Sequence, residues 1–301
     1  MIRAIDFYSH FLKKVENAPN FEYVNASISE IISNSTDNYI NTSIGNFKAK
    51  LIFSSLPKND KMNLKKYPLL NQSFIGWTIE TEEDVFDEKT MTLMDFNRNQ
   101  KDETRFIYVL PFSSRKALVE YTLFSEKIIS DQDYENGIKE YLNEKEIDNF
   151  KIIEKEKGNI PMTCFPFEKS NTNKLIYIGT AGGWTKPSTG YTIKNAIDKS
   201  KEITSYIKSN KALEHFNKRN RFWYYDLILL DVLKSTKGDG YKAFSYMFKR
   251  NNPIKILTFL DEKTTLFEEI PILLSVNKIP FIRALINRLA EIIDRIIRRP
   301  D

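Results

Sequence analysis

Apolar and polar residues alternate through the middle of the chain. Between residues 71 and 124 the alternation runs through four short segments, NQSFIGWTIET, MTLMDF, RFIYVLPF and KALVEYTLFS. Charged or serine-rich turns separate them. Because successive side chains of a strand point to opposite faces, this pattern predicts an antiparallel sheet.

Helical spacing predominates towards both ends. Residues 4–16 repeat apolar side chains every three or four positions, and a polar helix is predicted for residues 131–146. Residues 212–235 and 241–301 predict further helices, with breaks at KGDG, Pro253, Pro271 and Pro280. Strands are predicted in FEYVNASISEI and YINTSIGNFKAKLIFSS, and FKIIEKEKGNIPM predicts another strand pair or a bend.

The last helix, IPFIRALINRLAEIIDRIIRRPD, is strongly amphipathic. Its apolar side is formed by Ile282, Leu285, Ile286, Leu289, Ile293 and Ile296, and the arginines fall mostly elsewhere. Such a helix can lie in a membrane interface, but a helix docked on its own domain has the same pattern. No run of about 18 apolar residues exists that would span a bilayer.

A glycine-rich turn joins a predicted strand, KLIYIG, to a predicted helix, TIKNAIDKSKEITSYIK. Gly182 and Gly183 permit close approach of a ligand, and Ser188 or Thr189 can cap the helix. The first amides of a helix favour an anion. The segment therefore predicts a cradle for a flat or anionic ligand. A tight turn that only caps the helix is an equal alternative.

Two carboxylates stand among apolar strand residues. Alternation puts Glu120 on one face with Leu118 and Phe124, and Asp95 shares a face with Leu93. Removal from water would raise the pKa of Glu120 and make it a candidate proton donor or acceptor. The alternatives are an edge-strand glutamate that faces water and an aspartate that caps the turn before NRNQ.

Composition and charge exclude several classes of partner. The net charge of +5 is spread among mixed acids and bases, without the concentrated basic face of a nucleic-acid binder. The single cysteine, Cys164, allows no intrachain disulfide and indicates a reducing, cytoplasmic compartment. With two histidines and one cysteine a zinc site would be hard to assemble, so no metal is expected.

The segment GTAGGWTKPSTGYTIKNA resembles the glycine-rich stretch of the lycopene cyclases, which are flavin-dependent carotenoid enzymes. FIGWTIET, TLMDF, FIYVLPFSSRKALVEYTLFS, GNIPMT and FLDEKTTLFEEI occur in the same order as in that family. The resemblance covers nearly the whole chain. It implies an α/β (α+β) fold: an FAD-binding domain of the flavoprotein hydroxylase type with an inserted antiparallel sheet and a C-terminal helical region.

The resemblance also implies a division of the chain. Residues 1–60 would be the remainder of the FAD-binding domain, 61–165 the antiparallel-sheet substrate domain, 166–212 the returning FAD-binding segment and 213–301 the helical region. Such enzymes open with a strand, a GxGxxG-type turn and a helix, and this sequence contains no such turn. We therefore expect an N-terminally truncated domain that binds flavin poorly.

Site residues follow from the same resemblance. The family's ring-forming motif places a glutamate that matches Glu120, which implies that Glu120 is catalytic, with Asp95 as a second candidate. The cofactor-binding candidates are Gly179, Thr180, Gly182, Gly183, Pro187, Thr189, Gly190 and Tyr191. Candidates for lining a polyene channel or stabilising a cation are Phe74, Trp77, Tyr108 and Trp184. Plain core packing is the alternative for each aromatic residue.

The implied activity is cyclisation of lycopene end groups to β-rings by acid–base and carbocation chemistry, without net oxidation. Reduced FAD would assist, with NAD(P)H as its reductant. Lycopene and a membrane surface would be the partners, and the location would be cytoplasmic, at the inner face of the membrane. The alternatives are a flavin-dependent monooxygenase or reductase on the same fold, and an inactive, non-enzymatic fragment.

Overall fold

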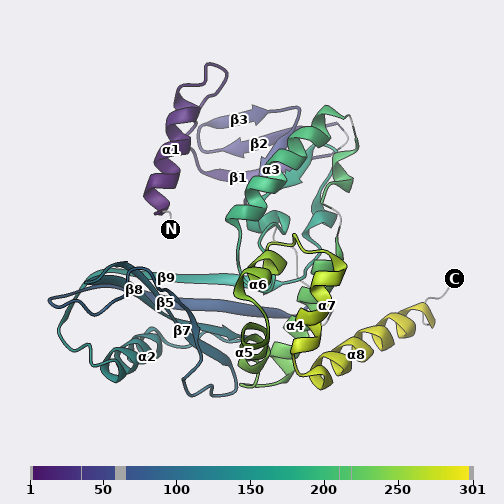
Figure 1. Cartoon of the computed structure of the whole chain (residues 1–301). Coiled ribbons are helices and arrows are strands. Elements are labelled where there is room, and N and C mark those ends of the chain that lie inside the picture. The colour runs from purple at the N-terminus through teal and green to yellow at the C-terminus, as the bar shows by residue number, and fades with distance from the viewer. Residues whose placement is uncertain (1–2, 35, 58–65, 210, 218, 298–301) are drawn as a thin grey trace.

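The structure is a computed structural model that describes residues 3–34, 36–57, 66–209, 211–217 and 219–297, with residues 292–297 described by their backbone alone. The helices are α1 (Ala4–Glu16), α2 (Asp131–Glu144), α3 (Ile193–Lys208), α4 (Arg221–Ser235), α5 (Tyr241–Arg250), α6 (Pro253–Leu260), α7 (Leu266–Ser275) and α8 (Lys278–Ile297) (Figure 1). The strands are β1 (Ile28–Ser33), β2 (Asn38–Thr42), β3 (Gly45–Lys48), β4 (Ile52–Ser54), β5 (Leu69–Thr81), β6 (Thr92–Asp95), β7 (Thr104–Ser113), β8 (Lys116–Ser125), β9 (Phe150–Thr163) and β10 (Leu175–Tyr177).

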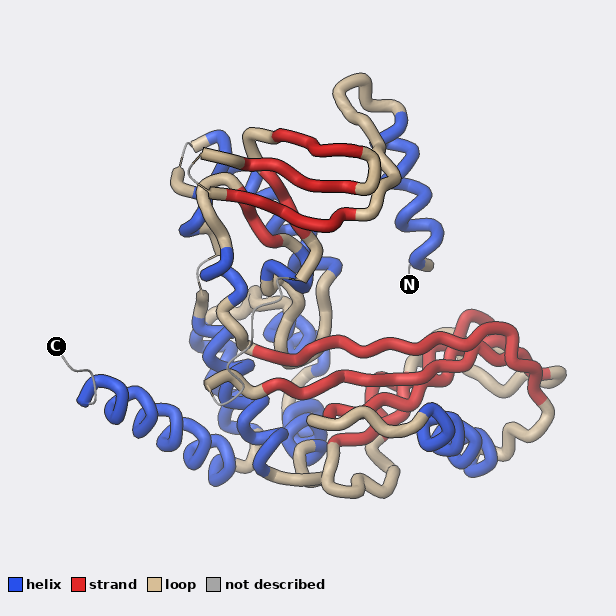
Figure 2. Tube along the Cα trace, turned by 180° about the vertical axis from the view of Figure 1, so that it is seen from behind, coloured by secondary structure: helices blue, strands red, loops and turns tan. Residues whose placement is uncertain are grey.

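The antiparallel sheet predicted from the alternating segments is confirmed. Its strands lie in the order β6-β7-β8-β5-β9, and Figure 2 shows β5 and β9 as long neighbouring strands. β9 forms one continuous strand along the far side of β5, where the sequence predicted a strand pair or a bend. Strand β5 is therefore hydrogen-bonded on both sides, with β8 on one and β9 on the other.

The two faces of this sheet have different coverings. Helix α2 packs on the face that carries Trp77, Val119 and Leu123, and it forms a closed core there with Tyr134 and Ile138. On the opposite face, Phe106 and Phe124 pack against Phe244 of α5 and Leu230 of α4. The strict alternation of β8 separates these two sets, as the sequence predicts.

A second region lies beyond one end of the large sheet. β1, β2 and β3 form an antiparallel sheet, whereas β4 and β10 pair in parallel although more than a hundred residues separate them (Figure 1). Helix α3 follows β10. The combination of parallel and antiparallel sheets with helices confirms the mixed α/β class.

The C-terminal region consists of α4 to α8. Asn220 caps α4 by accepting a hydrogen bond from Trp223 N, and Asn252 caps α6, where Pro253 occupies the first helical position. Two predicted breaks are wrong: Pro271 lies inside α7, and Pro280 lies in the first turn of α8. The first turn tolerates proline because its amides need no partner within the helix.

The apolar stripe predicted for the last helix is partly described. Ile282, Leu285, Ile286 and Leu289 are all exposed on α8, which Figure 1 shows extending away from the other helices. The side chains of Ile293 and Ile296 lie outside the described part. Within the ranges described, no helix is both long enough and apolar enough to cross a membrane.

Candidate active site

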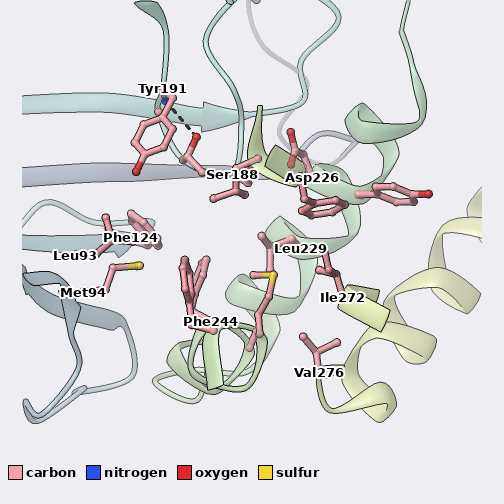
Figure 3. Close-up of a pocket in the computed structure, with 18 of the residues that line it drawn as sticks. Leu93, Met94, Phe124, Ser188, Tyr191, Asp226, Leu229, Phe244, Ile272 and Val276 are labelled. Atoms are coloured by element: carbon pink, nitrogen blue, oxygen red, sulfur yellow. Dashed lines mark hydrogen bonds between the residues drawn. The ribbon is translucent and has the colours of Figure 1, made fainter. Parts of the chain in front are cut away.

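A cavity of about 610 Å³ lies between the large sheet and the C-terminal helices. Figure 3 shows Leu93, Met94 and Phe124 on one side of it and Leu229, Ile272 and Val276 on the other. Its wall is mostly apolar and aromatic. Besides these six, the lining includes Phe74, Phe106, Tyr108, Tyr225, Phe244, Met247, Phe248, Phe259, Leu260 and Phe281. A hollow of this size and character suits a hydrocarbon ligand.

Glu120 of β8 is a carboxyl group in this apolar wall. Burial raises its pKa from an ordinary 4.5 to about 7, although the hydroxyl of Thr122, which donates to Glu120 Oε1, opposes the rise. Nearby negative charge on Glu156 raises the pKa further. Glu120 is therefore protonated in a substantial fraction of molecules near neutral pH, which is the state that a proton donor needs.

Two tyrosines accompany Glu120. Tyr108 of β7 is in register with Glu120, and Tyr191 lies in the loop before α3. Burial raises the pKa of both phenols. Both hydroxyl groups therefore stay neutral in the pH range in which Glu120 titrates, and they can act there as hydrogen-bond partners or as aromatic faces.

A second carboxylate, Asp226 of α4, lines the cavity as part of a buried ion network. Lys186 Nζ lies 2.9 Å from Asp226 Oδ2 and 3.2 Å from Glu262 Oε1. Burial alone would lower the pKa of Lys186, but the two carboxylates hold it above its ordinary value. Asp226 therefore has a cationic partner, which distinguishes it from Glu120.

The glycine-rich turn reaches the cavity only at its end. Ser188, Thr189, Gly190 and Tyr191 line the cavity, and Figure 3 shows Ser188 and Tyr191 at its edge. Gly190 has a φ of +71°, and a Cβ there would lie 2.6 Å from Gln72 Oε1. The loop can pass this close to β5 because position 190 has no side chain.

The beginning of this turn does not line the cavity. Gly183, Pro187 and Trp184 line a smaller, separate hollow, and a Cβ at Gly182 would lie 2.1 Å from the carbonyl oxygen of Tyr177. Gly179, at φ +58°, has open space around it, and Thr180 is exposed. The assignment of Gly179, Thr180, Gly182, Gly183 and Pro187 to cofactor binding stays a prediction.

Helix α3 begins at Ile193 with Thr192 as its N-cap, and no side chain caps it. The predicted caps, Ser188 and Thr189, lie too far upstream. The Thr189 hydroxyl instead accepts a hydrogen bond from Tyr191 N, drawn as the dashed line in Figure 3.

Three of the predicted catalytic and channel residues do not line the cavity. Trp77 is 1% exposed in the core under α2, because its side chain points to the face of β5 opposite to that of Phe74 and Gly76. Trp184 packs against Phe216 in another core. Asp95 pairs with Ile107 on the α2 face, and its Oδ1 accepts from Asn97 N, which is the turn-capping alternative.

Phe74 and Tyr108, by contrast, do line the cavity. The sequence reasoning missed Glu156 and Asp226. Asp226 interrupts the apolar run RFWYYDLILL at a position four residues from both Phe222 and Leu230, a spacing that puts it on their buried face.

Comparison with known proteins gives a consistent picture. A sequence profile of the family described as lycopene cyclase protein matches residues 1–286. A lycopene beta-cyclase from Paracoccus sp. (strain N81106 / MBIC 01143) is 28% identical over 129 residues, which cover 42% of this chain and only 33% of that relative.

Solved structures share the fold. A geranylgeranyl bacteriochlorophyll reductase-like protein from Thermoplasma acidophilum superposes with a TM-score of 0.53 at 13% identity, over 96% of this chain and 73% of that one. BrvH, a flavin-dependent halogenase from Brevundimonas sp. BAL3, gives 0.52 at 11% identity, over 98% and 66%. These likenesses confirm the predicted fold of the flavoprotein hydroxylase type.

Proposed function

This chain belongs to the lycopene cyclase family, and from that premise we propose that it closes the end groups of lycopene to β-rings. The observation that carries the proposal is the position of Glu120, a carboxylic acid that is protonated in a substantial fraction of molecules near neutral pH in the wall of an apolar cavity. A neutral polyene offers nothing but apolar surface to bind, and ring closure begins when an end double bond takes up a proton.

Each part of the cavity has a task in this reaction. The carboxyl proton of Glu120 passes to the end double bond, and a neighbouring double bond attacks the resulting carbocation. The Glu120 carboxylate then takes up a proton from a carbon next to the cation, which completes the ring without net oxidation. Aromatic faces such as those of Phe74 and Tyr108 stabilise positive charge, and the apolar wall excludes water that would trap the cation.

We infer that the end of the glycine-rich turn would hold one edge of a flavin ring. The first turn of α3 has no side-chain cap, so its amide groups can face an anionic ligand. Gly190 lets the backbone run close along the cavity edge between Thr189 and Tyr191. We propose that these three residues contact FAD. Reduced by NAD(P)H, the flavin would supply negative charge near the carbocation.

The substrate would enter from a membrane surface. The α7–α8 apolar stripe, defined as the exposed residues Leu266, Phe267, Ile270, Leu273, Leu274, Ile279, Ile282, Leu285, Ile286 and Leu289, borders the cavity. Leu273, Leu274 and Ile282 belong both to the stripe and to the cavity lining. A lipid-dissolved polyene would therefore meet continuous apolar surface from the bilayer to Glu120, with the protein peripheral to the membrane.

Expression of the protein in lycopene-producing bacteria tests the function. Pigment that changes from red to orange-yellow, with β-ring products on chromatography, is the expected result. Unchanged lycopene alongside flavin-loaded protein would overturn the proposal. Oxygenated or hydrogenated products, compared with and without air, would instead identify the monooxygenase or reductase alternative.

A further inference from the structure

Four residues form one row across the large sheet. Tyr108 of β7 is in register with Glu120 of β8, Glu120 with Gly76 of β5, and Gly76 with Glu156 of β9. Residues in direct register share a face of the sheet. Glu120 and Glu156 therefore stand on the same face, separated by a strand position that has no side chain.

Gly76 leaves the space in which the two carboxyl groups meet. A Cβ at this position would lie 3.1 Å from both Cγ and Oε1 of Glu156, and 2.9 Å from Leu118 Cδ1. Any other residue would force the side chains of Leu118 and Glu156 to shift. The glutamate of β9 thus leans over the glycine towards its counterpart on β8.

The contacts of Glu120 leave one of its carboxyl oxygens free to carry a proton. The hydroxyl of Thr122 donates to Glu120 Oε1, which leaves Oε2 to carry the proton. Glu156 raises the pKa of Glu120, and Glu120 in turn lowers the pKa of Glu156, so the two carboxyl groups interact across Gly76. Two ionised carboxylates repel each other and offer no donor, so this contact requires one proton for the pair.

The two members of the pair differ in their surroundings. Glu120 lines the apolar cavity, whereas Glu156 does not line it and is exposed on β9, although partial burial of its carboxyl group and the nearby Glu154 also raise its pKa. The proton consequently belongs on Glu120, where burial disfavours charge, and the charge belongs on Glu156, where water reaches it.

We propose that Glu156 is a positioning residue for Glu120: the two carboxyl groups share one proton across Gly76, and the exposed Glu156 carboxylate keeps that proton on the cavity-lining Glu120. This inference rests on the proposed function, because it assigns to the pair the acid that the cyclisation needs.

Other titratable groups around the pair do not replace this role. Tyr108 on β7 and Tyr191 before α3 have raised pKa values and stay neutral. Glu154, two residues from Glu156 on β9, adds negative charge that favours a proton on the pair. The neighbouring lysines of β9 are engaged elsewhere: Lys155 pairs with Glu135, and Lys157 with Asp131.

Infrared titration of the whole protein tests the inference without requiring turnover. In the wild type, a protonated-carboxyl band should disappear as the pH rises through about 7, and Glu120→Gln should abolish that band. Glu156→Gln removes the charge that favours protonation, so the band should disappear at a lower pH. Glu156→Asp keeps the charge on a shorter side chain and should give a smaller shift in the same direction.

The pH profile of cyclisation supplies the second readout. Each unit by which the pKa of Glu120 falls lowers the protonated fraction about tenfold above that pKa. Glu156→Gln should therefore lose roughly 3–10-fold in kcat/KM at about pH 8 and regain near wild-type activity at about pH 5.5. A purely structural residue would lose activity equally at both pH values.

The matched control is Glu80→Gln. Glu80 is an exposed glutamate on β5, in register with Lys116 and Lys151 and away from the row. This control should leave both the band and the pH profile unchanged.

Different results would overturn the shared proton and the proposed function. An unchanged titration of Glu120 in both Glu156 variants would overturn the shared proton even if β-rings form. Absence of β-rings from wild-type protein would overturn the function even if the band shifts as expected.

Discussion

Glu120 derives its chemistry from the residues that flank its position on β8. The apolar cavity removes it from water, Thr122 donates to one oxygen, and Glu156 approaches the carboxyl group across Gly76. The same side chain on the α2 face would lie in the closed core between Val119 and Tyr121. The position in the sheet, more than the residue type, therefore makes this glutamate a proton donor.

Replacing Glu120 with glutamine tests its role. Glu120→Gln keeps the size and most hydrogen bonds but removes the acidic proton, so cyclisation should fall by about 10²–10⁴-fold. The unfolding temperature should persist, and product formation in lycopene-fed extracts measures the loss. Asp95→Asn is the control, because Asp95 caps a turn on the other face. A comparable loss there would mean that the two acids share the role.

Glu120 should also make stability depend on pH. Its pKa is about 7 in the folded chain against an ordinary 4.5, so the folded state binds more protons between these values. The free energy of unfolding should consequently fall as the pH rises from about 4.5 to about 7, and this contribution should stay lost above that. With allowance for partial exposure, the loss is about 1–3 kcal/mol.

Urea titrations at several pH values measure this dependence. Glu120→Gln should be less sensitive to pH than the wild type over that range and more stable at about pH 8. Parallel curves for the two proteins would show that Glu120 titrates near its ordinary pKa.

At the scale of elements, the local pattern of one strand was sufficient to assign its faces. KALVEYTLFS predicts that Glu120 and Phe124 share a face, and the register confirms this. The same rule applied to FIGWTIET separates Trp77 from Phe74, and the assignment of both to one channel overlooked it. The approach of Glu156 to Glu120 could not be predicted in this way, because it depends on β5 lying between β8 and β9, a non-local pairing.

The α7–α8 apolar stripe predicts membrane binding that a single substitution weakens. Phe267 is 86% exposed, so Phe267→Ser should leave the fold intact. Burial of a phenylalanine in lipid is worth about 1.5–3 kcal/mol, so the affinity for vesicles that contain anionic lipid should drop roughly tenfold or more. Tyr23→Ser, at a residue 73% exposed in the segment between α1 and β1, is the control for vesicle flotation. Equal binding by both variants would contradict the assignment.

At the scale of the molecule, the site joins segments that are distant in sequence. One wall of the cavity comes from the sheet of residues 69–163, and the other from the helices after residue 221. Lys186, inside the glycine-rich turn, joins this turn to the helical wall, because it reaches Asp226 of α4 and Glu262 beyond α6. Helix boundaries and strand faces are local properties that the sequence predicts. The contact between the sheet, the glycine-rich turn and the C-terminal helices depends on the tertiary fold.

Removal of this cation should destabilise the whole fold. Lys186→Met leaves Asp226 and Glu262 without their cation, and Asp226 is deeply buried, so the free energy of unfolding should fall by about 3–5 kcal/mol. Lys194→Met, in the exposed pair with Asp261, should cost about 1 kcal/mol or less. Chemical denaturation compares the two variants. Equal small losses would show that water already screens the buried network.

The cavity has a consequence for the response of this fold to hydrostatic pressure. The apolar hollow of about 610 Å³ is open at the α7–α8 apolar stripe, but its enclosed part holds water poorly, and unfolding eliminates such a void. The unfolded chain therefore occupies less volume than the folded one, and compression favours it. A hydrocarbon that occupies the hollow removes this difference in volume, so the loaded protein should withstand pressures that unfold the empty one.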